Sequence, residues 1–170
     1  MTLRDGRTAL VRPITGEDGE RLVRFHSTLS DRSIYQRYFA AHPRLSEAEV
    51  HPFTHVDHSA REAYVAVVDD EIVGVGRWDE VNPERAEVAF LITDAYQRLG
   101  LGSVLFALLG QAARSRGIKE FVAETLPQNR AMIKLFEDLG ESCRKVNEEG
   151  TVFLSARLPD VAEGGLEVAK

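Results

Sequence analysis

The amino-acid sequence predicts an α/β (α+β) fold in which helices flank a mixed, mostly antiparallel sheet. Three β-rich runs at 63–68, 72–78 and 86–92 follow one another with short turns between them, which predicts an antiparallel meander. The third run leads through a glycine-containing turn into a long amphipathic helix and then a strand at 121–125. Because crossovers of this kind join parallel strands, the sheet is expected to be mixed.

The N-terminal part of the chain predicts one strand followed by three short helices. An apolar run at 8–14 indicates the strand, and residues 15–18 then supply a helix cap and an acidic first turn. A second helix is expected over about 30–39, where aromatic and aliphatic residues recur at helical spacing. Residues 46–49 form a capping-box pattern for a third helix, and Pro52 keeps that helix short.

The C-terminal part predicts two helices, a strand between them and a final hairpin. The first helix covers 103–116 and is closed by Gly117, and the second begins at its cap, Asn129. The hairpin is expected over 142–158. At 170 residues and 44% hydrophobic content, the chain fits one domain, expected to span 1–158, with 159–170 as a flexible tail or linker.

Composition narrows the classes of function. A formal net charge of −6 and the lack of a long Lys/Arg run argue against nucleic-acid binding. The single cysteine, Cys143, allows no intramolecular disulfide, and neither a signal peptide nor a bilayer-spanning run is evident, so a cytoplasmic location without membrane attachment is expected. His51, His55 and His58 suggest a metal site, but no cysteine assists them, and a polar loop with no metal is the favoured interpretation.

Glycines mark two places where a ligand or another backbone is expected to come close. Gly74 and Gly76 lie on one face of the second meander strand. Gly100 and Gly102 lie in the turn that joins the third strand to the long helix, within the stretch 86–102. Such a strand–turn–helix junction points main-chain N–H groups and the positive end of a helix dipole at one spot, which suits a phosphate-bearing ligand.

Several phosphate-binding turns compete for residues 97–102. A P-loop requires a lysine after its last glycine, and Ser103 stands there instead. A dinucleotide-binding fingerprint requires a glycine or alanine where this chain has Leu105, and its strand opens the domain rather than following a meander. A purely structural role, in which the glycines shape the helix start, stays open.

The motifs Gln97-Arg-Leu-Gly-Leu-Gly102 and Asn129-Arg-Ala-Met-Ile-Lys-Leu-Phe-Glu-Asp-Leu-Gly140, each following a strand, resemble those of the GNAT acetyltransferase superfamily over about residues 8–158. The resemblance implies a GNAT fold with six to seven strands, in which a central parallel pair splays apart. It also implies acetyl-CoA as co-substrate, with main-chain amides of the turn on its pyrophosphate and strand main chain beside its pantetheine arm. The residues implied in coenzyme binding are Leu91, Ile92, Gln97, Arg98, Leu99, Gly100, Leu101, Gly102, Ser103, Asn129, Met132 and Phe136.

A closer resemblance is to the GNAT domain of bacterial Pat-type protein lysine acetyltransferases. It rests on Asp5-Gly6, Val11-Arg-Pro-Ile14, Leu29-Ser30, Ser33-Ile-Tyr-Gln-Arg-Tyr-Phe39 and Ala86-Glu-Val-Ala-Phe90. In that family the domain is often joined to a regulatory or synthetase-like domain, and the targets include the active-site lysine of acyl-CoA synthetases. The resemblance therefore implies a protein lysine as acceptor.

Glu87 is the candidate general base. A lysine ammonium must lose a proton before it attacks a thioester, and Glu87 stands at the head of the strand expected to bind the coenzyme. Apolar neighbours such as Val88 and Phe90 are expected to raise its pKa by desolvation. The resemblance agrees, since protein lysine acetyltransferases of the superfamily have a glutamate at the matching position. The alternative is an exposed or structural residue, for instance the ion-pair partner of Arg85.

Further expectations concern the thioester carbonyl, the leaving thiolate and Cys143. Strand amides near Leu91 are expected to polarise the thioester carbonyl. Many superfamily members carry a tyrosine that protonates the departing thiolate, but Phe136 occupies the expected position, so no general acid is assigned. Cys143 is expected to be a buried structural thiol rather than a nucleophile. An N-acetyltransferase for a small amine and a non-catalytic acyl-CoA sensor remain as alternatives.

Overall fold

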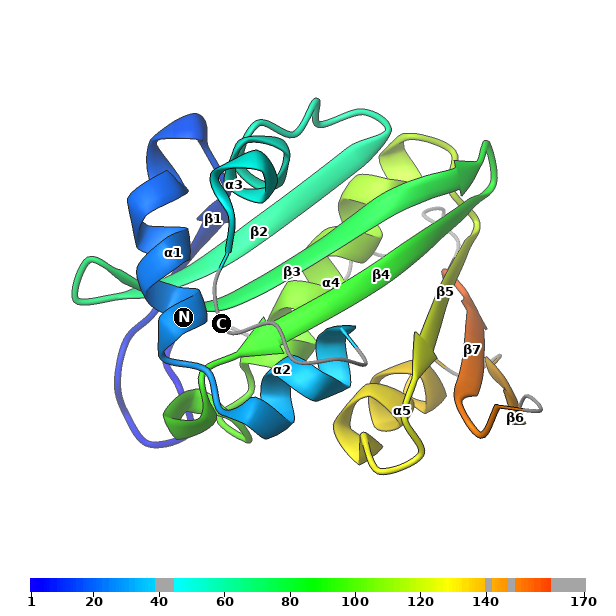
Figure 1. Ribbon diagram of the computed structural model, residues 1–170. Coiled ribbons are helices and arrows are strands. Elements are labelled where there is room, and N and C mark those ends of the chain that lie inside the picture. Colours follow the sequence, from blue (N-terminus) through cyan, green and yellow to red (C-terminus); the bar gives the residue numbers. More distant parts are fainter. Residues whose placement is uncertain (39–44, 140–141, 147–148, 160–170) are drawn as a thin grey trace.

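The computed structural model describes residues 1–38, 45–139, 142–146 and 149–159, and within it a seven-stranded sheet forms the centre of the molecule (Figure 1). The strands lie in the order β1-β2-β3-β4-β5-β7-β6, and β4 and β5 are its parallel pair. Their bounds are β1 Leu10–Pro13, β2 Arg61–Val68, β3 Glu71–Asn82, β4 Arg85–Ile92, β5 Glu120–Thr125, β6 Ser142–Val146 and β7 Val152–Arg157. The predicted mixed, mostly antiparallel sheet is confirmed.

Helices cover both faces of the sheet (Figure 1). On one face lie α1 (Gly19–Ser27), α2 (Asp31–Tyr38) and α3 (Glu47–Thr54), with α1 packed on β3 and α2 on β4. On the other face lie α4 (Leu101–Ser115), which packs on β2 and β3, and α5 (Arg130–Glu137), which packs on β7. Two single-turn 3₁₀ helices, η1 (Gly16–Asp18) and η2 (Asp94–Tyr96), precede α1 and the glycine turn.

The parallel strands β4 and β5 pair over only three residues each. The register runs from Arg85 opposite Glu120 to Glu87 opposite Val122, and no pairing follows along the described strands. Figure 1 shows the two ribbons parting beyond this point, while β5 stays paired with β7 along its whole length. The splayed central pair that the family resemblance implied is therefore present.

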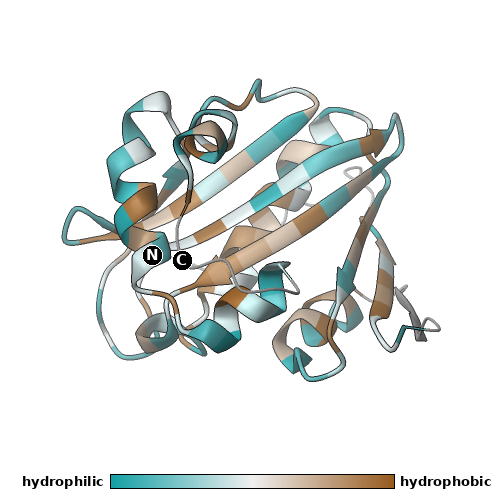
Figure 2. Cartoon of the chain, in the orientation of Figure 1, coloured by the Kyte–Doolittle hydropathy of each residue, from teal (hydrophilic) through white to brown (hydrophobic). Residues whose placement is uncertain are grey.

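The largest core cluster lies between the sheet and the α4–α5 face. Trp78, Phe121 and Phe136 are fully buried there, and β4 is hydrophobic along much of its length (Figure 2). A Cβ placed on Gly76 would lie 2.9 Å from both the Leu109 and Phe90 side chains. The glycine therefore admits α4 and an aromatic ring rather than a ligand, so the expectation of a close ligand approach at this strand is wrong for Gly76.

Some sequence-based expectations concern residues outside the described part of the chain. The predicted tail lies there from residue 160 onward, and the side chain of Cys143 does so too, although its main chain belongs to β6. The helices within the described ranges are all too short or too polar to cross a membrane.

A buried ion pair fixes the start of α1 against β1. The Arg12 guanidinium donates two hydrogen bonds, of 2.8 and 2.7 Å, to the two carboxylate oxygens of Asp18. The Asp18 side chain is 1% exposed and also accepts the Thr15 main-chain N–H at 2.8 Å. The hydrogen bonds from Arg12 hold the pKa of Asp18 below its usual value.

We expect Asp18→Asn to lower the free energy of unfolding by about 1–3 kcal/mol at neutral pH, because Arg12 loses its charged partner. A lowered folded-state pKa stabilises the protein above the unfolded value of about 3.9, and this stabilisation disappears as the pH falls through the folded value. Urea unfolding of both proteins between neutral pH and about pH 2 measures the difference. A difference that stays constant down to the lowest pH would show that the ion pair is not its source.

Candidate coenzyme and acceptor site

The turn between β4 and α4 is held in a conformation that aims main-chain amides outward. Gly100, the N-cap of α4, has φ +97°, and Arg98 has φ +63°, both in the left-handed region. Alternating conformations of this kind gather successive N–H groups into an anion-binding concavity, here at the positive end of a 15-residue helix. The structure therefore places the residues predicted for the pyrophosphate, 98–103, around one helix start.

Gly102 has no internal packing reason to lack a side chain. A Cβ built on it would lie 3.7 Å from Ile92 and 3.8 Å from Leu135, which are ordinary contacts. The protein interior therefore tolerates a larger residue at this position. A glycine here leaves the first turn of α4 open to an outside group, and a phosphate-bearing ligand is one that suits a helix start.

Gln97 makes side-chain hydrogen bonds that the sequence did not reveal. Its side-chain amide donates hydrogen bonds to the Ile92 carbonyl oxygen at 3.0 Å and to Ser33 Oγ at 3.2 Å. Asp94 accepts hydrogen bonds from the Ser30 and Ser33 hydroxyls, at 3.0 and 2.9 Å. These four side chains tie the start of α2 to the end of β4 and to the glycine turn. Since the partners lie more than 60 residues apart, no local pattern indicated the contact.

The register of β4 decides which main-chain groups face the gap between β4 and β5. The Lys119 N–H donates to the Glu84 carbonyl oxygen, on the β5 side, and the Thr93 N–H donates to the Val73 carbonyl oxygen, on the β3 side. Because successive residues of a strand point their main-chain groups in opposite directions, Phe90 and Ile92 face the gap, whereas Leu91 faces β3. The Ile92 carbonyl oxygen accepts a hydrogen bond from Gln97. The Ile92 N–H and the N–H and C=O of Phe90 remain on the gap side.

Glu87 lies at the last paired position before the strands part, and its side chain points to the sheet face that carries α1–α3. The side chain is exposed, so the expected burial of its carboxylate among apolar neighbours is wrong. The reason is strand alternation, which turns Val88 into the core and Glu87 to the opposite face, where its side chain is exposed. Arg85, the alternative partner, instead approaches Glu120 at 3.3 Å, and along the described chain Glu87 has no hydrogen bond or ion pair.

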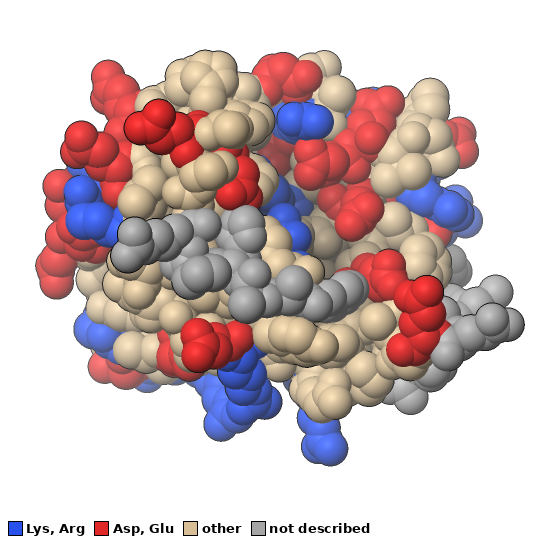
Figure 3. Space-filling model, viewed as in Figure 1, with Lys and Arg blue, Asp and Glu red and all other residues tan. Residues whose placement is uncertain are grey.

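The surroundings of Glu87 are acidic. Asp79 lies directly opposite it on β3 and pairs with Arg61 of β2 at 3.0 Å. Figure 3 shows acidic side chains gathered over this end of the sheet, beside a hollow in the middle of the same face. A negative potential at this position attracts cations and favours an approaching ammonium group.

The helix after β5 places its predicted residues in two different settings. The Asn129 side chain accepts the Met132 N–H at 3.2 Å and so caps α5. Met132 and Phe136 are buried, and Phe136 packs 5.6 Å from the ring of Phe106, so both residues anchor the helix. Near the end of β5, the Thr125 hydroxyl is buried without a hydrogen-bond partner among the described residues. A buried unpaired hydroxyl where β5 diverges from β4 is a ready partner for a polar ligand.

The three histidines do not assemble a metal site. His51 and His55 stack on each other at 4.0 Å, while His58 Nδ1 lies 2.6 Å from the Glu62 carboxylate. In the ranges that the structure describes, no group of three or more His, Cys, Asp or Glu side chains is arranged to hold a metal ion.

An opened parallel strand pair next to an amide-rich helix start is an arrangement that suits a long, phosphate-bearing ligand. The model of the acetyltransferase (GNAT) family matches residues 30–140, and the chain belongs to this family of acetyltransferases. The acetyltransferase PA5475 of Pseudomonas aeruginosa is 35% identical over 144 residues, which cover 82% of this chain and 77% of that protein.

Two further relatives carry the Pat name. The crystal structure of the GNAT domain of S. lividans PAT has a TM-score of 0.86 and 44% identity, covering 93% of this chain and 95% of that chain. The acetyltransferase Pat of Mycolicibacterium smegmatis is 29% identical over 148 residues. That alignment covers 82% of this chain but 43% of the mycobacterial protein, so the likeness extends over less than half of that relative.

Proposed function

We propose that this chain transfers an acetyl group from acetyl-CoA to the ε-amino group of a lysine in a protein, with Glu87 as general base. The observation that carries the proposal is the position of Glu87: exposed, unpaired among the described residues, and at the point where β4 and β5 part. The 44% identity to the GNAT domain of S. lividans PAT supports a protein as the acceptor.

In this proposal the glycine turn and the gap hold the coenzyme. The main-chain amides of 98–103 bind its pyrophosphate, and the gap-facing groups of Phe90 and Ile92 pair with its pantetheine arm. The resemblance assigned this pairing to Leu91 and Ile92, whereas the register of β4 favours Phe90 and Ile92. The open first turn of α4 at Gly102 and the unpaired Thr125 hydroxyl both fit such a ligand. The Gln97 side chain supports the site by holding the end of β4 in place.

Glu87 and the acidic surface around it serve the amine. The negative potential draws the lysine ammonium to Glu87. The Glu87 carboxylate then takes a proton from the ammonium, directly or through one water. Acetyl-CoA supplies an activated thioester, and the freed amine attacks its carbonyl carbon. The oxygen that becomes negative is met by a gap-facing main-chain N–H of β4. The C–S bond then breaks and the thiolate leaves without a side-chain acid, because Phe136, at the position where many superfamily members have a tyrosine, carries no proton to donate.

The test compares acceptors directly. The protein is incubated with acetyl-CoA and either an acyl-CoA synthetase, a protein class proposed as its target, or a panel of small amines, and product is followed by mass spectrometry. We expect acetylation of one synthetase lysine with kcat/KM well above that of every small amine. If a small amine is acetylated more efficiently than the protein, the acceptor is a small amine and the proposal is wrong. If the chain binds the coenzyme but acetylates no amine, the sensor-module alternative is supported instead.

A further inference from the structure

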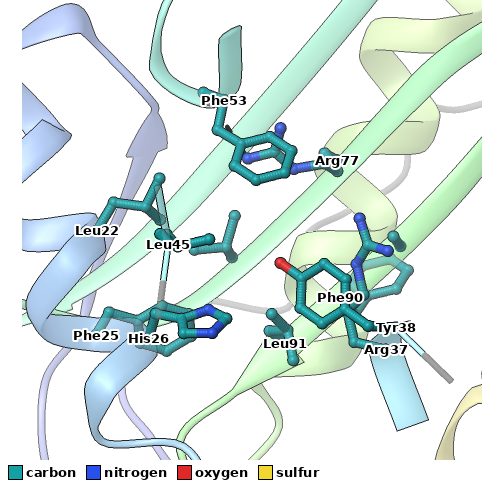
Figure 4. A pocket seen from close by; sticks show the side chains of 12 residues that line it. Leu22, Phe25, His26, Arg37, Tyr38, Leu45, Phe53, Arg77, Phe90 and Leu91 are labelled. Carbon is teal, nitrogen blue, oxygen red and sulfur yellow. Dashed lines mark hydrogen bonds between the residues drawn. The ribbon is translucent and has the colours of Figure 1, made fainter. Parts of the chain in front are cut away.

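A small pocket, with a cavity volume of about 30 Å³, lies between the sheet and the helices α1–α3 and opens to the surface (Figure 4). Its walls are mostly apolar and include Phe53 and Leu91, but two arginines, Arg37 of α2 and Arg77 of β3, also line it. The Tyr38 hydroxyl and the His26 ring point toward the middle of the same space (Figure 4). Among the described residues that line this pocket, none is acidic.

Arg77 is a half-buried cation without a carboxylate partner in the described chain. Its guanidinium donates a hydrogen bond to the Phe53 carbonyl oxygen at 3.3 Å and lies 4.3 Å above the Phe53 ring. Asp79, two residues along the strand, is engaged by Arg61 instead. Burial, with a smaller contribution from Arg37, lowers the pKa of Arg77 to about 10, so the group is still charged at neutral pH. A buried cation of this kind is stabilised by an anion that enters the pocket.

The pocket lies beside the proposed amine site. Arg77 is opposite Ala89 in the β3–β4 register, and the next pair on the same face is Asp79 with Glu87. On β4, Ala89, which lies opposite Arg77, is therefore separated from Glu87 by one strand repeat, about 7 Å. The surroundings of Glu87 and Arg77 have opposite charges, because Glu87 faces an acidic surface and Arg77 and Arg37 face the pocket. An acceptor ammonium is attracted to the first position and repelled from the second.

We propose that the Arg77 pocket binds a carboxylate of the acceptor, carried on a short apolar side chain close to the lysine that is acetylated. The proposal rests on the proposed function for its amine and adds a rule for acceptor choice: a positive group at Glu87 and a negative group at Arg77. The acceptor is the source rather than the acyl group, because Arg77 lies on β3. An acyl chain that starts in the gap between β4 and β5 would have to cross the face of β4 to reach it.

Paired peptides test this rule. Each peptide carries one lysine and a glutamate at one nearby position, and its partner carries glutamine there. At one or more spacings we expect the glutamate peptide to have a KM at least tenfold lower. Arg77→Met should abolish that ratio while the KM for acetyl-CoA stays unchanged, and Arg77→Lys should keep part of it, because a lysine retains the charge but not the planar pair of donors. A ratio that is the same in Arg77→Met and the unaltered protein would overturn the proposal.

Two further substrates, succinyl-CoA and free amino acids, show whether the carboxylate belongs to the acyl group or to the acceptor. If Arg77→Met specifically impairs the use of succinyl-CoA and leaves the peptide ratio intact, the carboxylate belongs to the acyl group and the proposal is wrong. If free amino acids are the acceptors and depend on Arg77, the pocket is confirmed with a small acceptor.

Direct binding keeps this test independent of turnover. Butanoate and its neutral amide are titrated into the protein and followed by NMR. Butanoate binding that Arg77→Met abolishes supports the pocket even if no lysine peptide is acetylated, a result that would refute only the proposed function. No binding of butanoate by the unaltered protein, together with equal use of the paired peptides, overturns the pocket.

Discussion

Replacing Glu87 by glutamine is expected to lower kcat at neutral pH by about 10²- to 10⁴-fold, the contribution typical of a general base. The glutamine keeps the size of the side chain but cannot accept the lysine proton. Because the Glu87 side chain makes no hydrogen bond or ion pair within the described residues, the substitution breaks no native polar contact, and the stability should change by less than about 0.5 kcal/mol. Turnover from pH 6 to 10 checks the first expectation and urea unfolding checks the second, while calorimetry shows whether acetyl-CoA still binds.

Glu80→Gln is the matched control for Glu87→Gln. Glu80 is an exposed acid near the same end of β3, and its replacement removes the same charge without touching the proposed base. Its kcat should stay within about threefold of the unaltered protein, since a single exposed charge is strongly screened. In the Glu87 variant, the residual rate should rise with pH as the free amine becomes available in solution. A Glu87→Gln protein that binds acetyl-CoA and keeps full turnover over the whole pH range would remove Glu87 from the mechanism.

Gly102→Glu is expected to weaken acetyl-CoA binding by at least about tenfold, which corresponds to about 1.4 kcal/mol. The new carboxylate would stand in the first turn of α4, where the pyrophosphate is proposed to lie, and two like charges at a helix start repel each other. The fold should not suffer, because a Cβ at this position meets only ordinary contacts. An acidic residue in the first turn and the loss of a helical glycine both favour the helix. Calorimetry gives the affinity, and urea unfolding gives the stability.

Gly102→Gln separates charge from bulk. It adds nearly the same volume without a negative charge, so its loss of affinity should be smaller than that of Gly102→Glu, and the gap between the two should narrow as salt is added. Unchanged acetyl-CoA binding in the glutamate variant, with unchanged stability, would mean that the phosphates are bound elsewhere.

Local pattern was enough to predict most of the fold. The β-rich runs 63–68 and 72–78, the turn predicted at 69–71 between them and the capping residue Ser46 are each local features that span only a few residues. The splayed parallel pair required the family resemblance, because a break in pairing between β4 and β5 leaves no mark on the periodicity of either strand.

The candidate site was predictable in part, for a related reason. The glycine turn and Glu87 stand out in the sequence, but burial depends on which face of a strand is covered, and the apolar neighbours of Glu87 point to the opposite face. The contact of Gln97 with Ser33 and the pocket around Arg77 bring together segments far apart in the chain. Such contacts follow from the topology of the sheet, which periodicity does not specify.

The parting of β4 from β5 also has a consequence for handling the protein. It creates two unprotected strand edges in the interior of a sheet, where unpaired N–H and C=O groups form a template for any extended peptide. A ligand that adds itself as a strand shields these edges, and by mass action it favours the folded state as its concentration rises above its dissociation constant. The opening proposed to admit the ligand is thus also a place where unliganded molecules are exposed to self-association.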